Sequence, residues 1–185
     1  MIATFQTIIK ECLKLNTVIL ANYSVNKDTL ALLSVAHPDY HTIAIETDRK
    51  LYIRKTPFQI IKAACLKGGS TYEGRRAAVT YLTGAKHKVP IPINPTEHIY
   101  AFPTYSPTQF ECSWIFHDHV HSISPYQKNH TVITFKNELQ LKLPVSYYTI
   151  EKQMYRTAQC IIRFTHFTNE KTFCMPRSTP ELIHY

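Results

Sequence analysis

The sequence has 185 residues, which is enough for one domain or at most two small ones. Apolar residues make up 44% and charged residues 18%, a balance that supports a packed core and excludes an intrinsically disordered chain, and no stretch approaches the length of a membrane-spanning helix. The formal net charge is +8, and with only four glycines the sequence has neither GxGxxG nor GxxxxGK[ST], the Gly-rich loops that hold nucleotide phosphates.

The first quarter of the sequence predicts one helix followed by an antiparallel meander. Apolar residues recur at helical spacing over residues 2–15. This segment has no charged leader before its apolar part and carries Lys10, Glu11 and Lys14 inside it, which argues against a secretory signal. Short apolar or alternating runs then predict four strands, at 17–21, 30–36, 42–46 and 51–54.

Residues 57–83 predict two short helices joined by a Gly-Gly-Ser turn. The run Thr-Pro-Phe-Gln at 56–59 is typical of a helix start, with Thr as the cap, Pro in the first turn and Gln three residues after the cap. The two glycines at 68–69 end this helix. The run Ser-Thr-Tyr-Glu at 70–73 is a second capping box, which predicts a second helix over about 71–82.

The second half of the sequence predicts further strands and then a long helix. The proline-rich run at 89–95 indicates a rigid connector or an edge segment. Ser146 caps a helix that keeps apolar spacing to about Phe164. Four strands are predicted between them, at 98–102, 110–123, 131–135 and 139–143, of which the last two form a hairpin.

The predicted fold class is therefore α+β. We expect a single domain with an antiparallel sheet, a short basic helix pair at about 57–83 and a long helix near 146–164. The domain is expected to span residues 1–167, and the polar segment at 168–185 is expected to be a C-terminal tail with little fixed structure.

The positive charge is concentrated within forty residues of the sequence. Residues 49–88 contain ten Lys or Arg and a single acid, Glu73, whereas the segments on either side are nearly balanced. Such a block predicts a polyanionic partner, although a solvated basic face that serves solubility is the plainer alternative. A membrane surface would require an unbroken amphipathic helix, and Pro57 and the glycines interrupt this segment.

The second helix of the pair is the candidate nucleic-acid contact. Its N-terminus offers backbone N–H groups and a positive dipole end to a phosphate. We predict that Arg75 and Arg76 enter or line a DNA groove and that Lys86 and Lys88 grip phosphates. Asn and Gln, which read adenine in the major groove, are absent from 70–88, and this favours minor-groove or shape readout. The candidate DNA-binding residues are Lys62, Lys67, Gly69, Ser70, Thr71, Arg75, Arg76, Lys86 and Lys88. A helical hairpin that makes only core contacts is the alternative.

The run His-Asp-His-Val-His at 117–121 is a candidate metal site. On a strand its three histidines share a face, which suits zinc, and a fourth ligand could come from Cys112 or Asp118. Asp118 would point to the opposite face, however, and the alternation arises by chance in a chain with ten histidines. A surface strand or a pH-sensitive polar face is favoured, no metal site is predicted, and a metal-dependent hydrolase is kept as an alternative function.

The cysteines and acids do not assemble into a catalytic site. Cys65 lies on an apolar helix face, Cys112 has no recognisable flanking motif, and the acids are sparse. No enzyme and no cofactor is therefore predicted. The wide spacing of the cysteines, without any Cys-x-x-Cys, indicates buried thiols in a reducing cytoplasm. The five are Cys12, Cys65, Cys112, Cys160 and Cys174.

Aromatic residues form the basis of a second alternative function. They make up 12% of the sequence and are spread through its middle. Stacking on unpaired bases would make the protein an RNA-binding or single-strand-binding protein, whereas packing in the core is the simpler interpretation. The residues concerned are Tyr72, Tyr81, Tyr100, Phe102, Tyr105, Trp114 and Phe116.

The sequence resembles the competence transcription factor ComK family of Gram-positive bacteria. The similarity covers roughly residues 50–165. Its specific parts are the run from Gly69 to Arg76, the run Pro-Val-Ser-Tyr at 144–147, where the long helix is expected to begin, and the run Tyr-Arg-Thr-Ala at 155–158 within that helix. The motifs are KTPFQIIKAACLKGGSTYEGRRA (55–77), HKVPI (87–91), FPTYS (102–106), CSWIFHDHV (112–120) and LPVSYYTIEKQMYRTA (143–158).

The resemblance implies a function and partners. Members of the family are transcription activators of competence genes that bind AT-rich boxes in duplex DNA mainly through the minor groove. The implied assembly is a homodimer, with two dimers on a two-box site, and the implied location is the cytoplasm, at the nucleoid. Family members are also captured by an adaptor of the Clp protease through a C-terminal segment, from which the run Phe-Cys-Met-Pro at 173–176 departs.

Overall fold

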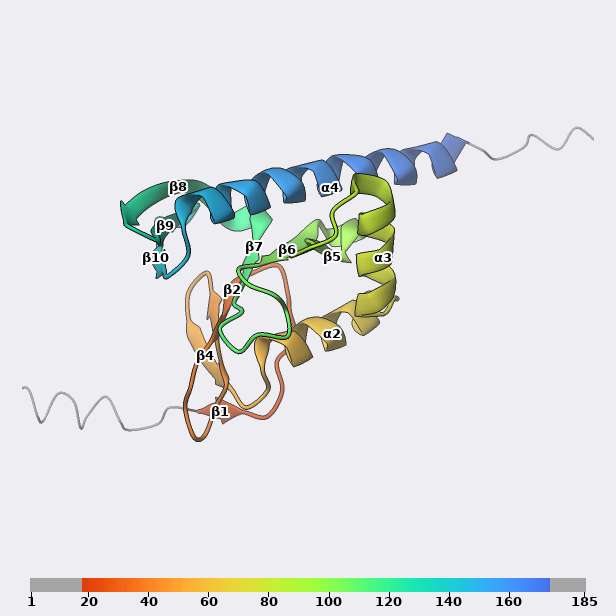
Figure 1. The fold of residues 1–185 in the computed structure, drawn as a ribbon. Helices are drawn as coiled ribbons and strands as arrows, with labels where there is room; N and C mark the ends of the chain where they lie inside the picture. The colour runs from red at the N-terminus through yellow and green to blue at the C-terminus, as the bar shows by residue number, and fades with distance from the viewer. Residues whose placement is uncertain (1–17, 174–185) are drawn as a thin grey trace, which may run out of the picture.

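The computed structural model describes residues 18–173, which form two β-sheets and three α-helices (Figure 1). The helices are α2 (Pro57–Lys67), α3 (Tyr72–Thr83) and α4 (Tyr147–Phe173), and there are two 3-10 turns, η1 (Pro95–Glu97) and η2 (His117–His119). The strands are β1 (Ile19–Leu20), β2 (Thr29–Ser34), β3 (Thr42–Glu46), β4 (Lys50–Ile53), β5 (Ile91–Asn94), β6 (Ile99–Pro103), β7 (Trp114–Phe116), β8 (Val120–Gln127), β9 (His130–Phe135) and β10 (Gln140–Leu143).

The larger sheet has seven strands in the order β1-β4-β3-β2-β7-β6-β5, and the smaller has three in the order β10-β9-β8. All pairings are antiparallel except that of β1 with β4. The predicted α+β class and the single domain are confirmed. The prediction of an antiparallel meander is wrong for its first strand, because β1 skips two neighbours and pairs in parallel with β4. The proline-rich run does form an edge strand, β5.

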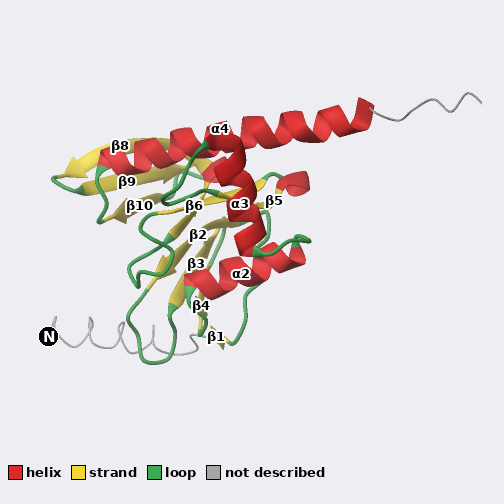
Figure 2. Ribbon diagram, turned by 45° about the vertical axis from the view of Figure 1, so that its right-hand side comes forward, coloured by secondary structure: helices red, strands yellow, loops and turns green. Residues whose placement is uncertain are grey.

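The larger sheet is buried on both faces. Alternate residues of its strands point to opposite sides, so Ala44 and Trp114 join one apolar cluster while Ile45 and Ile115 join another. The first cluster packs against α2 and the start of α3, which cover one face in Figure 2. The second packs against the smaller sheet and the N-terminal half of α4. Two layers around one sheet make a sizeable core from a chain of this length.

The predicted strand at 110–123 is divided between the two sheets. Its middle residues form β7 in the larger sheet, its last residues begin β8 in the smaller sheet, and η2 turns the corner between them. Alternating polarity predicts extended backbone but gives no sign that the strand changes partners. The loop between β6 and β7 is correspondingly longer than predicted, ending at Ser113.

The helix boundaries follow the capping residues. The capping box predicted at Thr56 is present: Thr56 Oγ1 accepts from the Gln59 amide, and Gln59 Oε1 accepts from the Thr56 amide. The second helix is instead capped one residue later than predicted, by Thr71, whose hydroxyl accepts from the Gly74 amide at 3.0 Å. Gly84 ends α3 in the left-handed conformation, with φ +73°.

The long helix is longer than its sequence pattern predicts. It continues to Phe173, so the domain boundary proposed after residue 167 falls inside α4. Thr149 donates its amide to Ser146 Oγ, which supports the predicted cap. In Figure 1 the C-terminal part of α4 extends past α3. The helix predicted at 2–15 lies outside the described residues.

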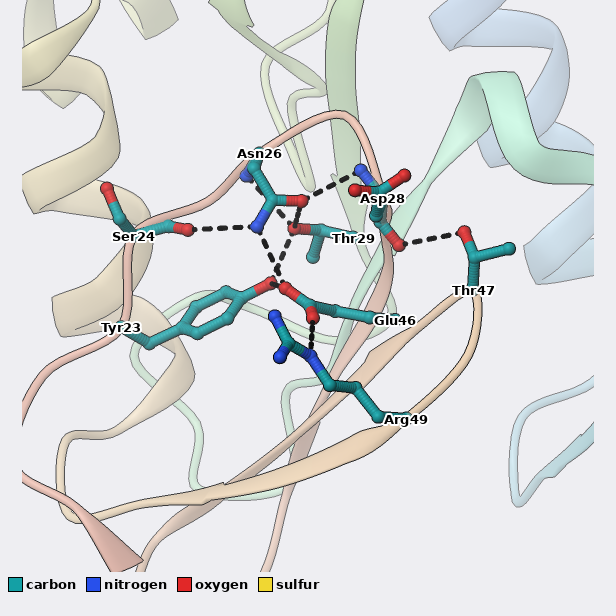
Figure 3. Close-up of polar contacts among 8 residues, drawn as sticks. All are labelled: Tyr23, Ser24, Asn26, Asp28, Thr29, Glu46, Thr47 and Arg49. Atoms are coloured by element: carbon teal, nitrogen blue, oxygen red, sulfur yellow. Dashed lines mark hydrogen bonds and ion pairs between the residues drawn. The ribbon is translucent and has the colours of Figure 1, made fainter.

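A polar network fixes the segment before β2 against the end of β3 (Figure 3). Its centre is Glu46, whose carboxylate is buried and accepts hydrogen bonds from Tyr23, Asn26 and Arg49. The hydroxyl oxygen of Tyr23 also lies 2.6 Å from the hydroxyl oxygen of Thr29. A buried carboxylate is tolerated only with such partners, so the network determines where this loop lies.

Over the described residues, 18–173, none of the helices has the length and apolar character that crossing a membrane requires.

Candidate nucleic-acid interface

The corner between α2 and α3 is held together by close backbone contacts. A Cβ atom on Gly68 would lie 2.3 Å from the carbonyl oxygen of Ile93, so this position accepts only glycine without movement. The carbonyl oxygen of Gly68 accepts a hydrogen bond from Arg75 Nη2. Gly69 follows in the left-handed conformation, with φ +82°. These contacts set the direction of α3 relative to α2.

Arg75 therefore has a structural partner. Arg75 belongs to α3 and is half-buried, and its Nε lies buried without a hydrogen-bond partner among the described residues. The guanidinium points toward the protein, while the next residue, Arg76, is exposed. The two arginines that the sequence treats as equivalent are thus in different environments.

The two lysines of α2 also contact neighbouring side chains. Lys62 Nζ lies 3.0 Å from the carboxylate of Glu73 on α3 and 5.1 Å from the centre of the Phe58 ring. The hydrogen bond from Lys62 lowers the pKa of Glu73. Lys67 donates to the hydroxyl of Ser24 at 2.9 Å. Both lysines are exposed, and contacts of this kind on a protein surface are weak, so a phosphate can compete for them.

The N-terminus of α3 is partly occupied by its own cap. Thr71 takes the amide of Gly74, and Arg75 N–H bonds to the Thr71 carbonyl as part of the helix. Gly69 and Thr71 are exposed and Ser70 is half-buried. The predicted anion position at this helix start is therefore accessible, with fewer free amides than an uncapped helix would offer.

Exposed basic side chains lie on α3 and on the loop that follows it. Arg76 and Lys86 are exposed, and so is His87, which was not among the predicted DNA-binding residues. The described residues form four ion pairs, and none of them includes Arg76, Lys86 or Lys88. Arg76 Nη2 donates to the Lys86 carbonyl at 3.3 Å, which brings helix and loop together. We call Arg76, Lys86 and His87, together with Arg156 of α4, the basic loop surface.

Lys88 is turned inward. It adopts a left-handed backbone conformation, with φ 48°, and its Nζ donates to the Thr104 carbonyl at 3.2 Å. The ammonium also lies 5.4 Å from the centre of the Tyr105 ring. The structure therefore brings Arg76 and Lys86 together but gives Lys88 contacts within the protein.

Arg156 was not among the predicted site residues. Its Nη1 donates to the His87 carbonyl at 3.0 Å, so α4 meets the loop that follows α3. The helical pattern places this residue next to the buried Thr157, at the margin of the packed face. A sequence gives no sign that a loop some seventy positions earlier lies there; only the tertiary structure does.

The histidine run does not form the predicted strand. His117 and His119 lie in η2, and His121 lies in β8 beyond it, so the shared face that zinc requires is absent. Among the side chains that the structure describes, no group of three His, Cys, Asp or Glu residues is placed to hold a metal ion. Burial lowers the pKa of His117, which favours its neutral form.

The described cysteines and most of the named aromatics belong to the core. Cys65, Cys112 and Cys160 are buried free thiols, and burial raises the pKa of the first two to about 11 and that of Cys160 to about 12. Such thiols are poor nucleophiles at neutral pH. Cys12 and Cys174 lie outside the described residues. The buried aromatics are Tyr72, Tyr100, Phe102, Trp114 and Phe116; Tyr105 is half-buried, and Tyr81 is exposed.

The comparisons with known proteins agree with the resemblance found in the sequence. Residues 20–169 match the family model described as ComK protein. The chain is also 37% identical over 146 residues to the competence transcription factor of Bacillus subtilis (strain 168), across 78% of this chain and 76% of that protein. No solved structure matches it. The matched region runs from β1 into α4 and contains both short helices and the basic loop surface, and the chain belongs to the ComK family.

Proposed function

We propose that the protein is a transcription activator of competence genes that binds AT-rich boxes in double-stranded DNA, mainly through the minor groove. The observation that supports this most is the basic loop surface, where the exposed Arg76 and Lys86 adjoin the half-buried Arg156 of α4. None of the three forms an ion pair with a carboxylate among the described residues. The relative from Bacillus subtilis, named a competence transcription factor, supports the regulatory role. On this proposal the protein is not an enzyme, and it acts in the cytoplasm at the nucleoid.

The charges of this surface suit phosphate better than a protein partner. Each phosphate neutralised by Lys or Arg releases condensed counterions, so binding weakens steeply with salt. Arg76 is the arginine of the candidate list that is exposed, and we assign it to the minor groove, whose negative potential in A-tracts favours arginine. Lys86 is assigned to phosphate, with Lys62, Lys67 and the start of α3 flanking it.

The test is a binding series with AT-rich duplex, GC-rich duplex and single strands at several salt concentrations. Arg76→Ala is expected to weaken binding to the AT-rich duplex most, while Lys86→Ala should weaken binding to every duplex alike and reduce the salt slope by about 1. Lys136→Ala is the matched control, because Lys136 pairs with Asp118 beside the smaller sheet. Equal binding to both duplexes with unchanged Arg76→Ala affinity contradicts the minor-groove assignment. Preference for single strands would favour the RNA or single-strand alternative.

We propose further that the protein is a homodimer, with two dimers on a two-box site, and that α4 supplies the interface. Four of the eight large apolar side chains exposed by residues 18–165 lie on α4 and the end of α3: Tyr81 at 89%, Tyr148 at 68%, Tyr155 at 65% and Ile162 at 56%. The three on α4 recur every seven residues and so share one face. Tyr155 and Ile162 also line a groove with Leu82 of α3. A second copy running antiparallel would place Tyr155 against itself and Tyr148 against Ile162 twice.

The dimer proposal is tested by sedimentation of the DNA-free protein. Tyr155→Glu is expected to convert dimers to monomers, because it places a charge in the centre of the apolar face. Tyr126→Glu, at an exposed tyrosine of β8, is the control and should leave the dimer intact. A wild-type protein that sediments as a monomer at all concentrations contradicts the proposal.

An adaptor of the Clp protease is kept as a proposed partner. The tail that would bind it, 174–185, lies outside the described residues. Pull-down of full-length protein and of a chain ending at residue 173 by such an adaptor decides the matter, since only the full-length protein should be retained.

A further inference from the structure

The loop between α3 and β5 is fixed by its carbonyl groups in an unusual way. Four successive carbonyl oxygens, those of residues 85–88, each accept a hydrogen bond from a side chain. The donors are Thr80 Oγ1 to Ala85 at 2.9 Å, Arg76 Nη2 to Lys86 at 3.3 Å, Arg156 Nη1 to His87 at 3.0 Å and Gln153 Nε2 to Lys88 at 2.9 Å. Two donors come from α3 and two from α4, so the loop is bound to both helices.

Gln153 joins one of these contacts to the core of the protein. Gln153 is 1% exposed, and its Nε2 donates both to the Lys88 carbonyl and, at 2.8 Å, to the Pro103 carbonyl. A buried amide that lost these acceptors would bear the cost of unmade hydrogen bonds. The loop conformation is therefore tied to the packing of α4 on β6, and Lys88 takes its left-handed conformation within it.

The carbonyl oxygens and the side chains of this loop have different surroundings. A carbonyl oxygen is the negative end of the peptide dipole, and all four oxygens are directed at side chains of the protein. The side chains of Lys86 and His87 are exposed. The loop thus directs its carbonyl oxygens at side chains of α3 and α4 and leaves the side chains of Lys86 and His87 exposed.

We propose that Arg156 is a positioning residue for DNA binding, which fixes loop 85–88 by its backbone and thereby presents Lys86 and His87 to DNA phosphate. The inference rests on the proposed DNA-binding function and adds two residues, Arg156 and His87, to its machinery. Arg156 acts through the loop: its guanidinium is half-buried against the His87 carbonyl, whereas a side chain that only contacts phosphate needs no such partner.

A double-mutant cycle tests this. Lys86→Ala is measured in the wild type and in the Arg156→Gln variant, with affinity for one AT-rich duplex as the readout. If Arg156 acts by positioning Lys86, Lys86→Ala should lower affinity by a clearly smaller factor in the Arg156→Gln background than in the wild type. Lys136→Gln removes the same charge from an exposed position beside the smaller sheet and is the control, in which the Lys86→Ala factor should stay as in the wild type. Additive effects of Arg156→Gln and Lys86→Ala overturn the proposal.

A second readout needs no DNA. Amide hydrogen exchange of residues 85–89 should become faster in Arg156→Gln than in the wild type and should stay at the wild-type rate in Lys136→Gln. It should be partly restored in Arg156→Lys, which keeps a donor. Unchanged exchange in Arg156→Gln overturns the positioning role. His87→Ala is expected to lower DNA affinity in the wild type but little in Arg156→Gln, and an affinity that His87→Ala leaves unchanged removes that residue from the proposal. If the wild type fails to bind DNA at all, the proposed function fails, while the exchange experiment still decides how the loop is held.

Discussion

Glu46 is a buried carboxylate that needs several hydrogen-bond donors around it. Its residue is 3% exposed, and its carboxylate accepts from Tyr23 at 2.8 Å, from Asn26 at 2.8 Å and from Arg49. Burial raises the pKa of this carboxyl, but the hydrogen bonds from Asn26, Arg49 and Tyr23 outweigh burial and hold the pKa below its ordinary value of 4.5. The network therefore stabilises the folded state only while Glu46 is ionised.

This carboxylate predicts how stability changes in acid. Because the folded-state pKa is lowered, its stabilising contribution is present above pH 4.5 and is lost as the pH falls through the folded-state value. Glu46→Gln should lower the free energy of unfolding by about 1–2 kcal/mol at neutral pH, and the difference from the wild type should shrink in acid. Urea unfolding across this pH range measures it, with Glu111→Gln, at an exposed glutamate, as the control. If the difference in unfolding free energy between Glu46→Gln and the wild type persists in acid, the carboxylate charge is not its cause.

At the scale of elements, local signals predict the two short helices well and the strand partners less well. The cap at Thr56 and the glycine at 84 act within a few residues, so the sequence predicts α2 and the end of α3 closely. The parallel pairing of β1 with β4 and the division of 110–123 between two sheets depend on partners distant in the chain. Alternating polarity is the same whichever sheet a strand joins.

The start of α3 provides a matched pair of substitutions. The sequence predicts Ser70 as the cap, but Thr71 Oγ1 is the atom that accepts from the Gly74 amide, whereas Ser70 Oγ contacts the Thr71 carbonyl at 3.5 Å. Thr71→Ala should therefore cost about 1 kcal/mol of stability, and Ser70→Ala should cost clearly less. Chemical denaturation of both variants decides between the two caps, and a larger loss for Ser70→Ala would contradict the structure.

At the scale of the whole molecule, the charge block predicted where positive side chains gather but not how they are used. Composition identifies residues 49–88, yet it does not distinguish Arg75, which holds the α2–α3 corner, from the exposed Arg76. It also assigns no role to Arg156, because that residue joins the basic loop surface only when α4 packs beside α3. The partner class is readable from charge, whereas the individual contacts need the tertiary structure.

The two sheets are expected to unfold in one transition. They share an apolar cluster that includes Ile115 of the larger sheet, Ile133 of the smaller sheet and Ile150 of α4, and η2 joins them without a linker. Calorimetry should therefore give a calorimetric enthalpy equal to the van't Hoff enthalpy. Circular dichroism and the fluorescence of Trp114, buried in the larger sheet, should report the same midpoint. Separate midpoints would show that the smaller sheet opens alone.

The tight corner at η2 also bears on how long the protein lasts in a cell. If neither sheet opens without the other, a protease that needs an extended segment of the described region finds one only in the rare globally open chains. A ligand held by the native form alone makes such chains rarer still. On the proposed function, copies bound to promoters would then outlive unbound ones, and the lifetime of the protein would rise with the number of free binding sites available to it.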